Sequence, residues 1–248
     1  MSETAIDLLL AGRLKLEQPL RGHRAGTDAI LLAAAVPPDV GGLLADAGAG
    51  VGTAGLVAGL VRPGLDLLLI EREPELAALA EANLARNGLK GRVMACDLLD
   101  AKSRRAAGLE DGAADIVISN PPFLDPGEGR ASPDSLRARA HVFDEIGGIE
   151  SWIRACVAIG SAQAEIFLIH RADRLPELLE ALKGRTGGVR VIPVHPHAGE
   201  DASRVLIRAK KGSRAPFQLR PPLVLHEADG RFTPLVEAIH RGEGCINW

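Results

Sequence analysis

Short runs of Leu, Ile and Val alternate along the central part of the chain with longer segments in which apolar positions recur at helical spacing. We expect the apolar runs to be strands, and they cover residues 43–45, 66–70, 92–96, 115–119 and 165–170. The expected helices cover residues 52–60, 74–87, 149–159 and 175–183. Such alternation is typical of βαβ units, in which helices cover a buried parallel sheet.

The late part of the chain shows a different pattern. Two apolar runs at 189–193 and 203–209 have no helix-length segment between them, so we expect these strands to pair antiparallel. One more strand and a short helix are expected at 223–226 and 233–241. The sheet should therefore be mostly, but not wholly, parallel.

The beginning of the chain predicts a small hairpin in residues 6–20. Thr27-Asp28 is then expected to cap a helix over residues 29–36. No linker is long enough to separate two domains, so we expect a single domain. Its parts are a hairpin and helix in 1–40, a core in 41–210 and a C-terminal extension in 211–248.

Composition adds three constraints. Of the 248 residues 46% are hydrophobic, and no run of about 18 apolar residues exists, so we expect a cytoplasmic protein without a membrane span. Cys96, Cys156 and Cys245 lie far apart, which disfavours a disulfide scaffold and fits a reducing compartment. The net charge of -3 argues against a dedicated nucleic-acid binder, although the run from Arg204 to Arg220 is basic. That run is either a binding patch or a solvated face.

A glycine-rich turn follows the first core strand and opens a helix. Glycines are needed there because the backbone must turn tightly and let a ligand approach closely. The spacing is G-x-G-x-G, and Thr53 occupies the position where the dinucleotide fingerprint requires a third glycine, which disfavours a dehydrogenase. The candidate binding positions of this turn are Asp46, Gly48, Gly50 and Gly52.

Two acids follow the next two strands. Glu71 ends the second core strand, where a carboxylate can accept hydrogen bonds from both hydroxyls of a ribose. Asp97 ends the third strand and could accept from an adenine amino group. Taken singly, Glu71 could be a solvated acid and Asp97 a helix cap. The carboxyl ends of neighbouring parallel strands converge on one crevice, which favours a shared nucleoside site.

Together, the turn and the two acids resemble the class I methyltransferases. The resemblance implies an α/β, Rossmann-like fold, with three αβα layers and a seven-stranded, mostly parallel sheet that has an antiparallel late strand. It also implies S-adenosyl-L-methionine as cofactor and no metal. In that family the glycine loop holds the methionine part, the acid at Glu71 the ribose, and the acid at Asp97 the adenine.

The fourth core strand runs into a tetrapeptide of candidate catalytic residues, which are Asn120, Pro121, Pro122 and Phe123. Two consecutive prolines fix φ and remove two backbone donors, so the carbonyls beside them are rigid acceptors. The Asn120 side-chain oxygen and the Pro121 carbonyl could each accept one N–H of a substrate amino group. Accepting these hydrogens localises the nitrogen lone pair, and the fixed dipoles stabilise the positive charge that develops on methylation. Phe123 offers a face on which a planar ring can stack.

This tetrapeptide resembles the (N/D/S)-P-P-(Y/F/W) motif of amino-methyltransferases, in which the Asn position also contacts the cofactor. The segment from Gly22 to Leu32 resembles the opening of bacterial tRNA(Val) adenine-N6 methyltransferases, which modify the adenosine beside the anticodon. The resemblance to the tRNA(Val) enzymes implies that Thr27 and Asp28 also belong to the cofactor site and that the partner is tRNA. Three alternatives remain: a ribosomal guanine-N2 methyltransferase, a protein glutamine-N5 methyltransferase, and a silent cofactor-binding module that interacts with RNA.

Several further residues give weaker signals. Arg137, Arg139 and Arg204 are candidate phosphate contacts, and residues 124–143 form a long connection suited to the substrate side. His195 and His197 lie near two acids, but Pro196 and Gly199 favour a loop over a metal site.

Overall fold

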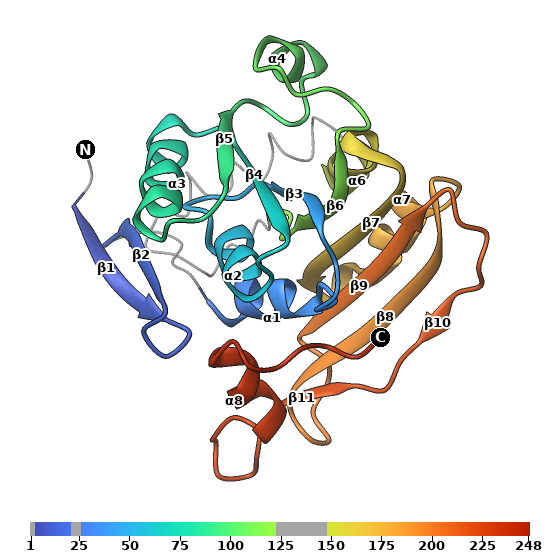
Figure 1. Cartoon of the computed structure of the whole chain (residues 1–248). Coiled ribbons are helices and arrows are strands. Elements are labelled where there is room, and N and C mark those ends of the chain that lie inside the picture. Colours follow the sequence, from blue (N-terminus) through green and yellow to red (C-terminus); the bar gives the residue numbers. More distant parts are fainter. Residues whose placement is uncertain (1–2, 21–25, 123–147) are drawn as a thin grey trace, which may run out of the picture.

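The computed structural model describes residues 3–20, 26–122 and 148–248, and Figure 1 shows their arrangement. Within these ranges a sheet of nine strands forms the centre of the molecule. Its strands are β3 (Gly42–Ala47), β4 (Leu65–Glu71), β5 (Gly91–Ala95), β6 (Ala114–Ser119), β7 (Gly160–Arg171), β8 (Thr186–His197), β9 (Arg204–Lys211), β10 (Gln218–Leu219) and β11 (Leu223–His226). A separate hairpin is made of β1 (Thr4–Leu9) and β2 (Leu14–Pro19).

The strand order is β10-β8-β9-β7-β6-β3-β4-β5, and β11 also pairs with β8. Strand β9 is antiparallel to β7 and β8, as expected from the short connection, and the other pairs are parallel. The seven strands expected in the core are all present, and β11 confirms the further strand expected at 223–226. The sheet has more than the expected seven strands, because β11 and the short β10, which was not expected, both pair with β8. Prolines in this segment exclude a helix, so the chain runs extended and pairs with the free edge.

Helices cover both faces of the sheet and give three layers (Figure 1). One face carries α1 (Thr27–Ala35), α2 (Thr53–Val61), α3 (Pro74–Arg86) and α8 (Pro234–His240). The other carries α6 (Gly148–Ile159) and α7 (Leu175–Leu182). The sequence analysis did not predict the short helix α4 (Ala101–Ala106). Its N-cap residue is Asp100, whose side chain accepts from the Lys102 amide.

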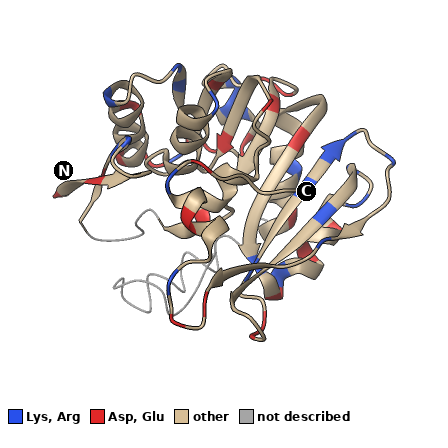
Figure 2. Cartoon of the chain, turned by 60° about the horizontal axis from the view of Figure 1, so that its bottom comes forward, with Lys and Arg blue, Asp and Glu red and all other residues tan. Residues whose placement is uncertain are grey.

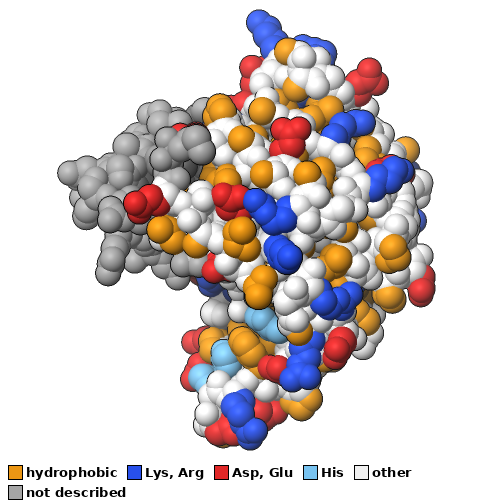
Figure 3. Space-filling model, turned by 60° about the vertical axis from the view of Figure 1, so that its left-hand side comes forward, with side chains coloured by type: hydrophobic (Ala, Val, Ile, Leu, Met, Phe, Trp, Pro, Cys, Tyr) orange, Lys and Arg blue, Asp and Glu red, His pale blue; other side chains and the backbone are white. Residues whose placement is uncertain are grey.

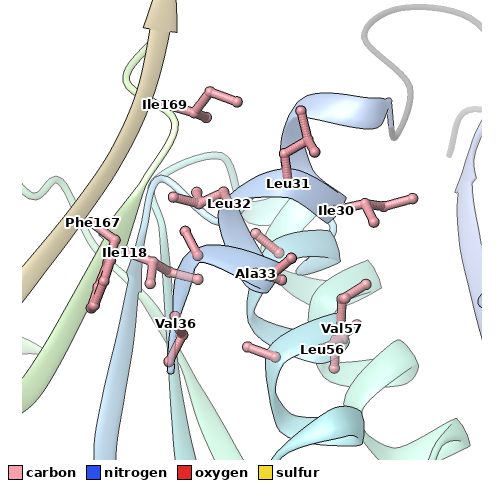
Figure 4. Close-up of a cluster of buried hydrophobic side chains, with 14 of the residues drawn as sticks. Ile30, Leu31, Leu32, Ala33, Val36, Leu56, Val57, Ile118, Phe167 and Ile169 are labelled. Atoms are coloured by element: carbon pink, nitrogen blue, oxygen red, sulfur yellow. The ribbon is translucent and has the colours of Figure 1, made fainter. Parts of the chain in front are cut away.

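Helix α1 is anchored in the first of these two cores. Leu31 and Leu32 are fully buried and lie against the sheet residues Ile118, Phe167 and Ile169 (Figure 4). Full burial of each such side chain contributes about 1.5–3 kcal/mol. The position of the first turn of α1 relative to the sheet is therefore fixed by packing.

The amino-terminal hairpin is attached to the core by two asparagines one helical turn apart on α3. Asn83 is completely buried; it accepts from the Glu17 amide at 2.7 Å and donates to the Glu17 carbonyl at 2.8 Å. Asn87 likewise accepts from the Lys15 amide at 2.9 Å and donates to the Lys15 carbonyl at 2.8 Å. Asn83 also donates to the Val51 carbonyl at 3.1 Å, which ties the hairpin to the glycine turn.

Two local expectations are wrong. Neither Thr27 nor Asp28 caps α1, because its N-cap residue is Gly26 and its first residue is Thr27. No side chain of a described residue caps this helix. His195 and His197 do not lie in a loop, because β8 extends to His197. Strand β8 continues beyond its last pair with β9, and there it pairs with β11. Pro196 is tolerated in this part of the strand because its missing N–H falls at a sheet edge.

Candidate active site

The candidate site lies where the sheet changes direction. Strands β3 to β7 are parallel, so their carboxyl ends meet at one edge. From β3 the chain continues to β4 and β5 on one side and later returns to β6 and β7 on the other. Such a switch point is where open α/β sheets bind ligands.

The glycine turn connects β3 to α2 and presents its backbone at this edge. Gly48 and Gly50 have φ of 77° and 56°, a backbone conformation that residues other than glycine rarely adopt. The amides of Gly48 and Ala49 both donate to the Ile70 carbonyl, at 3.0 and 2.9 Å. A Cβ built on Gly50 would meet no atom of a described residue within 4 Å. Among the described residues the turn therefore leaves room for a ligand at Gly50.

Glu71 is held by two backbone amides. Its Oε2 accepts from Gly50 at 2.8 Å, and its Oε1 accepts from Glu73 at 2.9 Å. The residue is 9% exposed, so its carboxylate is fixed at the end of β4. Each carboxylate oxygen has a second lone pair. The geometry fits a ribose whose two hydroxyls donate to this carboxylate.

Asp97 follows β5 at the same edge and is half-buried. Its Oδ1 accepts from the Leu99 amide at 2.9 Å, in a local turn, and its own amide donates to Ser103 Oγ at 3.0 Å. Helix α4 is capped by Asp100 instead. Asp97 is therefore not a helix cap, which leaves the interpretation as an adenine contact open.

Asp46 lies beneath the turn rather than on its surface. It is 3% exposed, and its Oδ2 accepts from the Gly55 amide at 2.8 Å. Burial raises the pKa of Asp46 to about 7, and the negative charge of Glu71 adds to this rise. Asp46 thus holds the start of α2 against β3, and its protonation state changes near neutral pH.

This raised pKa predicts a specific pH dependence of stability. Unfolded Asp46 ionises near 3.8 and folded Asp46 near 7, so the folded state binds more protons between these values. The contribution of Asp46 to the free energy of unfolding should be fully present below about pH 4 and should fall until about pH 7. Urea unfolding of wild type and Asp46→Asn between pH 4 and 8 measures it as a difference that shrinks with rising pH. Asp39→Asn, at an exposed position, is the control. A difference that stays constant would contradict the raised pKa.

The predicted catalytic residues lie directly after β6. The paired part of β6 ends at Ser119, so the carbonyls of Asn120 and Pro121 lie beyond the ladder. Asn120 Oδ1 is buried and has no hydrogen-bond partner within the described ranges. A buried acceptor without a partner costs about 1–3 kcal/mol. Phe123 lies outside the described residues, as do Arg137 and Arg139.

Asp28 and Arg204 meet at the carboxyl edge of the sheet. Arg204 Nε donates to Asp28 Oδ2 at 2.9 Å, although the two are 176 positions apart. Arg204 begins β9 opposite Arg171, the last residue of β7. The structure thus brings two predicted site residues together, where each neutralises the charge of the other. Thr27 precedes Asp28 in the same turn.

Sequence reasoning missed two residues at this edge, Ser119 and Trp152. Ser119 Oγ donates to the Ala47 carbonyl at 2.7 Å and accepts from Trp152 Nε1 at 2.9 Å. Trp152 belongs to α6, and its ring lies beside Gly48. A usable signal was present, because Trp152 is one of two tryptophans in a chain without tyrosine and lies in the helix expected after the catalytic segment.

Two negative findings apply to the described part of the chain. None of its helices is both long and apolar enough to span a bilayer. Among the described residues no three His, Cys, Asp or Glu side chains are grouped so that they could hold a metal ion. His195 instead contacts the Glu200 carbonyl through Nδ1 at 2.5 Å, and His197 lies 3.1 Å from the Glu200 carboxylate.

Comparison with known proteins gives consistent matches. The family model described as the methyltransferase small domain matches residues 24–139. A tRNA1(Val) (adenine(37)-N6)-methyltransferase from Porphyromonas gingivalis is 28% identical over 92% of this chain and 91% of its own. A ribosomal RNA small subunit methyltransferase C from Sodalis glossinidius is 38% identical, but over only 34% of this chain and 22% of its own.

A solved structure agrees with these matches. A protein from Agrobacterium tumefaciens, described as a predicted O-methyltransferase, is 34% identical, with a TM-score of 0.74 over 88% of this chain and 98% of its own. The enzyme TYW2 of M. jannaschii, solved with AdoMet, shares the fold at 13% identity and a TM-score of 0.57, over 85% of this chain and 86% of its own.

Proposed function

Because the chain belongs to the class I S-adenosyl-L-methionine-dependent methyltransferases, we propose that it methylates N6 of an adenosine in tRNA, beside the anticodon. The match to the Porphyromonas gingivalis enzyme, which extends over nearly the whole of both chains, supports this substrate. A cytoplasmic location fits such a substrate and the three free cysteines.

In this proposal some residues at the sheet edge bind the cofactor and others bind the substrate. S-adenosyl-L-methionine supplies an electrophilic methyl group on a sulfonium. The glycine turn would hold its methionine part, Glu71 its ribose and Asp97 its adenine. Asn120 Oδ1 and the Pro121 carbonyl would accept the two hydrogens of the adenosine amino group. They would turn the nitrogen lone pair toward the methyl group and stabilise the positive charge that develops on nitrogen. The sulfur would leave as a neutral thioether, and the methylated nitrogen would lose one proton to solvent. Phe123 would stack on the base.

The buried, unpartnered oxygen of Asn120 carries this proposal. Native structures leave few buried polar atoms without a partner, and each exception requires an explanation. Acceptance from a substrate amino group would satisfy this oxygen only in the complex, where the hydrogen bond contributes to the reaction. A hydroxyl substrate offers one hydrogen, whereas an amino group offers two for the two neighbouring acceptors. The geometry therefore favours an amino nitrogen over an oxygen.

The basic run of the sequence is less available to RNA than its charge suggests. Arg204 is paired with Asp28, Arg208 with Glu165, and Lys211 donates to two backbone carbonyls at the end of α6. Lys210 and Arg214 are exposed and form no ion pair with any described residue. In Figure 2 several Lys and Arg positions lie along the strands near the C-terminus, whereas Figure 3 shows both signs interspersed on another face. We propose that Arg137, Arg139 and these free cations contact phosphates.

The deciding experiment offers unmodified tRNA, ribosomal RNA and a peptide-chain release factor in parallel, with radiolabelled cofactor. We expect label in tRNA as N6-methyladenosine, identified by mass spectrometry of nucleosides. Binding of tRNA should weaken with salt by up to about one log-log slope unit per phosphate contact. Label in the release factor alone would overturn the RNA assignment. Label only in guanosine would keep the mechanism and move the enzyme to the guanine-N2 group.

A further inference from the structure

Trp152 contacts both Gly48 of the glycine turn and Ser119, the residue before Asn120. It lies in the second turn of α6, and its indole Nε1 donates to Ser119 Oγ at 2.9 Å. Its ring lies so close to the glycine turn that a Cβ on Gly48 would be 2.9 Å from Cζ2 and 3.1 Å from Cη2. The absence of a side chain at Gly48 is what lets the ring approach.

Ser119 connects Trp152 to strand β3 through a second hydrogen bond. Its hydroxyl is completely buried and donates to the Ala47 carbonyl at 2.7 Å. Ala47 and Ser119 are also register partners at the ends of β3 and β6. Each is followed by a functional segment, the glycine turn after Ala47 and Asn120 after Ser119. A chain of two side-chain hydrogen bonds thus joins α6, β6 and β3 at the point where both segments leave the sheet.

We propose that Trp152 is a positioning residue that locks Asn120 in register with the glycine turn, and that its ring forms the wall of the cofactor site at Gly48. This inference rests on the proposed function, because it takes Gly48 and Asn120 as site residues. Within it, the indole N–H fixes Ser119, and Ser119 fixes the backbone that carries Asn120. The ring excludes water from the methionine side of the turn.

The alternative is that Trp152 is an ordinary core aromatic. Trp248 provides the comparison, because its Nε1 also donates to an oxygen, the Ala35 carbonyl at 2.7 Å, and its ring lies 6.0 Å from that of Phe167. Both indoles are half-buried, but only Trp152 contacts a residue of the candidate site. The two tryptophans therefore make a matched pair, one at the site and one away from it.

The chain has two tryptophans and no tyrosine, so fluorescence can report on each indole separately. Trp248→Phe leaves only Trp152, and we expect its emission to change when S-adenosyl-L-methionine or S-adenosylhomocysteine is added. Trp152→Phe leaves only Trp248, and we expect no change. Calorimetry on both variants shows whether the cofactor is bound. Binding without a change in Trp152 emission would overturn the wall assignment, and absence of binding in wild type would overturn the proposed function itself.

Kinetics tests the positioning role. Trp152→Phe keeps an aromatic ring and removes the N–H, so kcat should fall about tenfold while the dissociation constant of the cofactor changes less than about threefold. Ser119→Ala should have the same effect by removing the same connection, and Trp248→Phe should leave kcat unchanged. If both tryptophan variants lose the same amount of activity, or neither loses any, Trp152 has only a structural role. Circular dichroism checks that the variants fold.

Discussion

Replacement of Asn120 by alanine is expected to lower the rate of methyl transfer by about 10²–10³ and to leave cofactor affinity within a few-fold of wild type. The reason is that Asn120 Oδ1 is a buried acceptor without a partner among the described residues, and in the proposed mechanism it accepts from the amino group that becomes charged in the transition state. The acceptor costs nothing to organise during the reaction, because folding has already oriented it. Single-turnover assays with saturating cofactor measure this loss directly.

Two further variants sharpen this test. Asn120→Asp keeps an acceptor oxygen at the same distance along the side chain and should retain more activity than alanine. Asn247→Ala changes an exposed asparagine near the C-terminus and should retain full activity. Turnover of Asn120→Ala within a few-fold of wild type would show that the catalytic role assigned to Asn120 is wrong.

Replacement of Glu71 by alanine should weaken cofactor binding by at least about 100-fold. Two ribose hydroxyls would lose a charged acceptor, and each such hydrogen bond contributes about 1.5–3 kcal/mol. The amides of Gly50 and Glu73 would also lose their acceptor, which loosens the glycine turn. Calorimetry should give micromolar binding for wild type, about 8 kcal/mol, and no measurable heat for the variant at the same concentrations.

The ribose contact can be separated from the effect on the turn. A 2′-deoxy analogue of S-adenosylhomocysteine should bind wild type more weakly than the parent compound. The Glu71→Ala variant should discriminate between the two far less, because the acceptor is gone. Glu75→Ala, at an exposed position in the first turn of α3, serves as the control for charge. Equal discrimination by wild type and Glu71→Ala would place the ribose elsewhere.

The amino-acid sequence alone determined the elements and most of the residues proposed for the site. Continuous apolar runs predicted β3 to β9, because a strand covered on both faces is apolar throughout, and apolar positions at helical spacing predicted the main helices. Local chemistry also marked the glycine turn, Glu71, Asp97 and Asn120. Parallel strands have their carboxyl ends at one edge, so sequence order was sufficient to bring these residues together.

Only the tertiary structure decided which partners the polar side chains take. Asp28 was expected to cap its own helix and instead pairs with Arg204, which is far away in sequence. In the basic run, Arg204 and Arg208 form ion pairs with acids of other segments, and Lys211 donates to backbone carbonyls. The 2.9 Å contact of Trp152 with Ser119, and the space that Gly48 leaves for its ring, could not be read from the neighbouring residues of the sequence. Hydrogen bonds and ion pairs act over a few ångströms, so their partners are set by the packing of distant segments and not by the local pattern of the sequence.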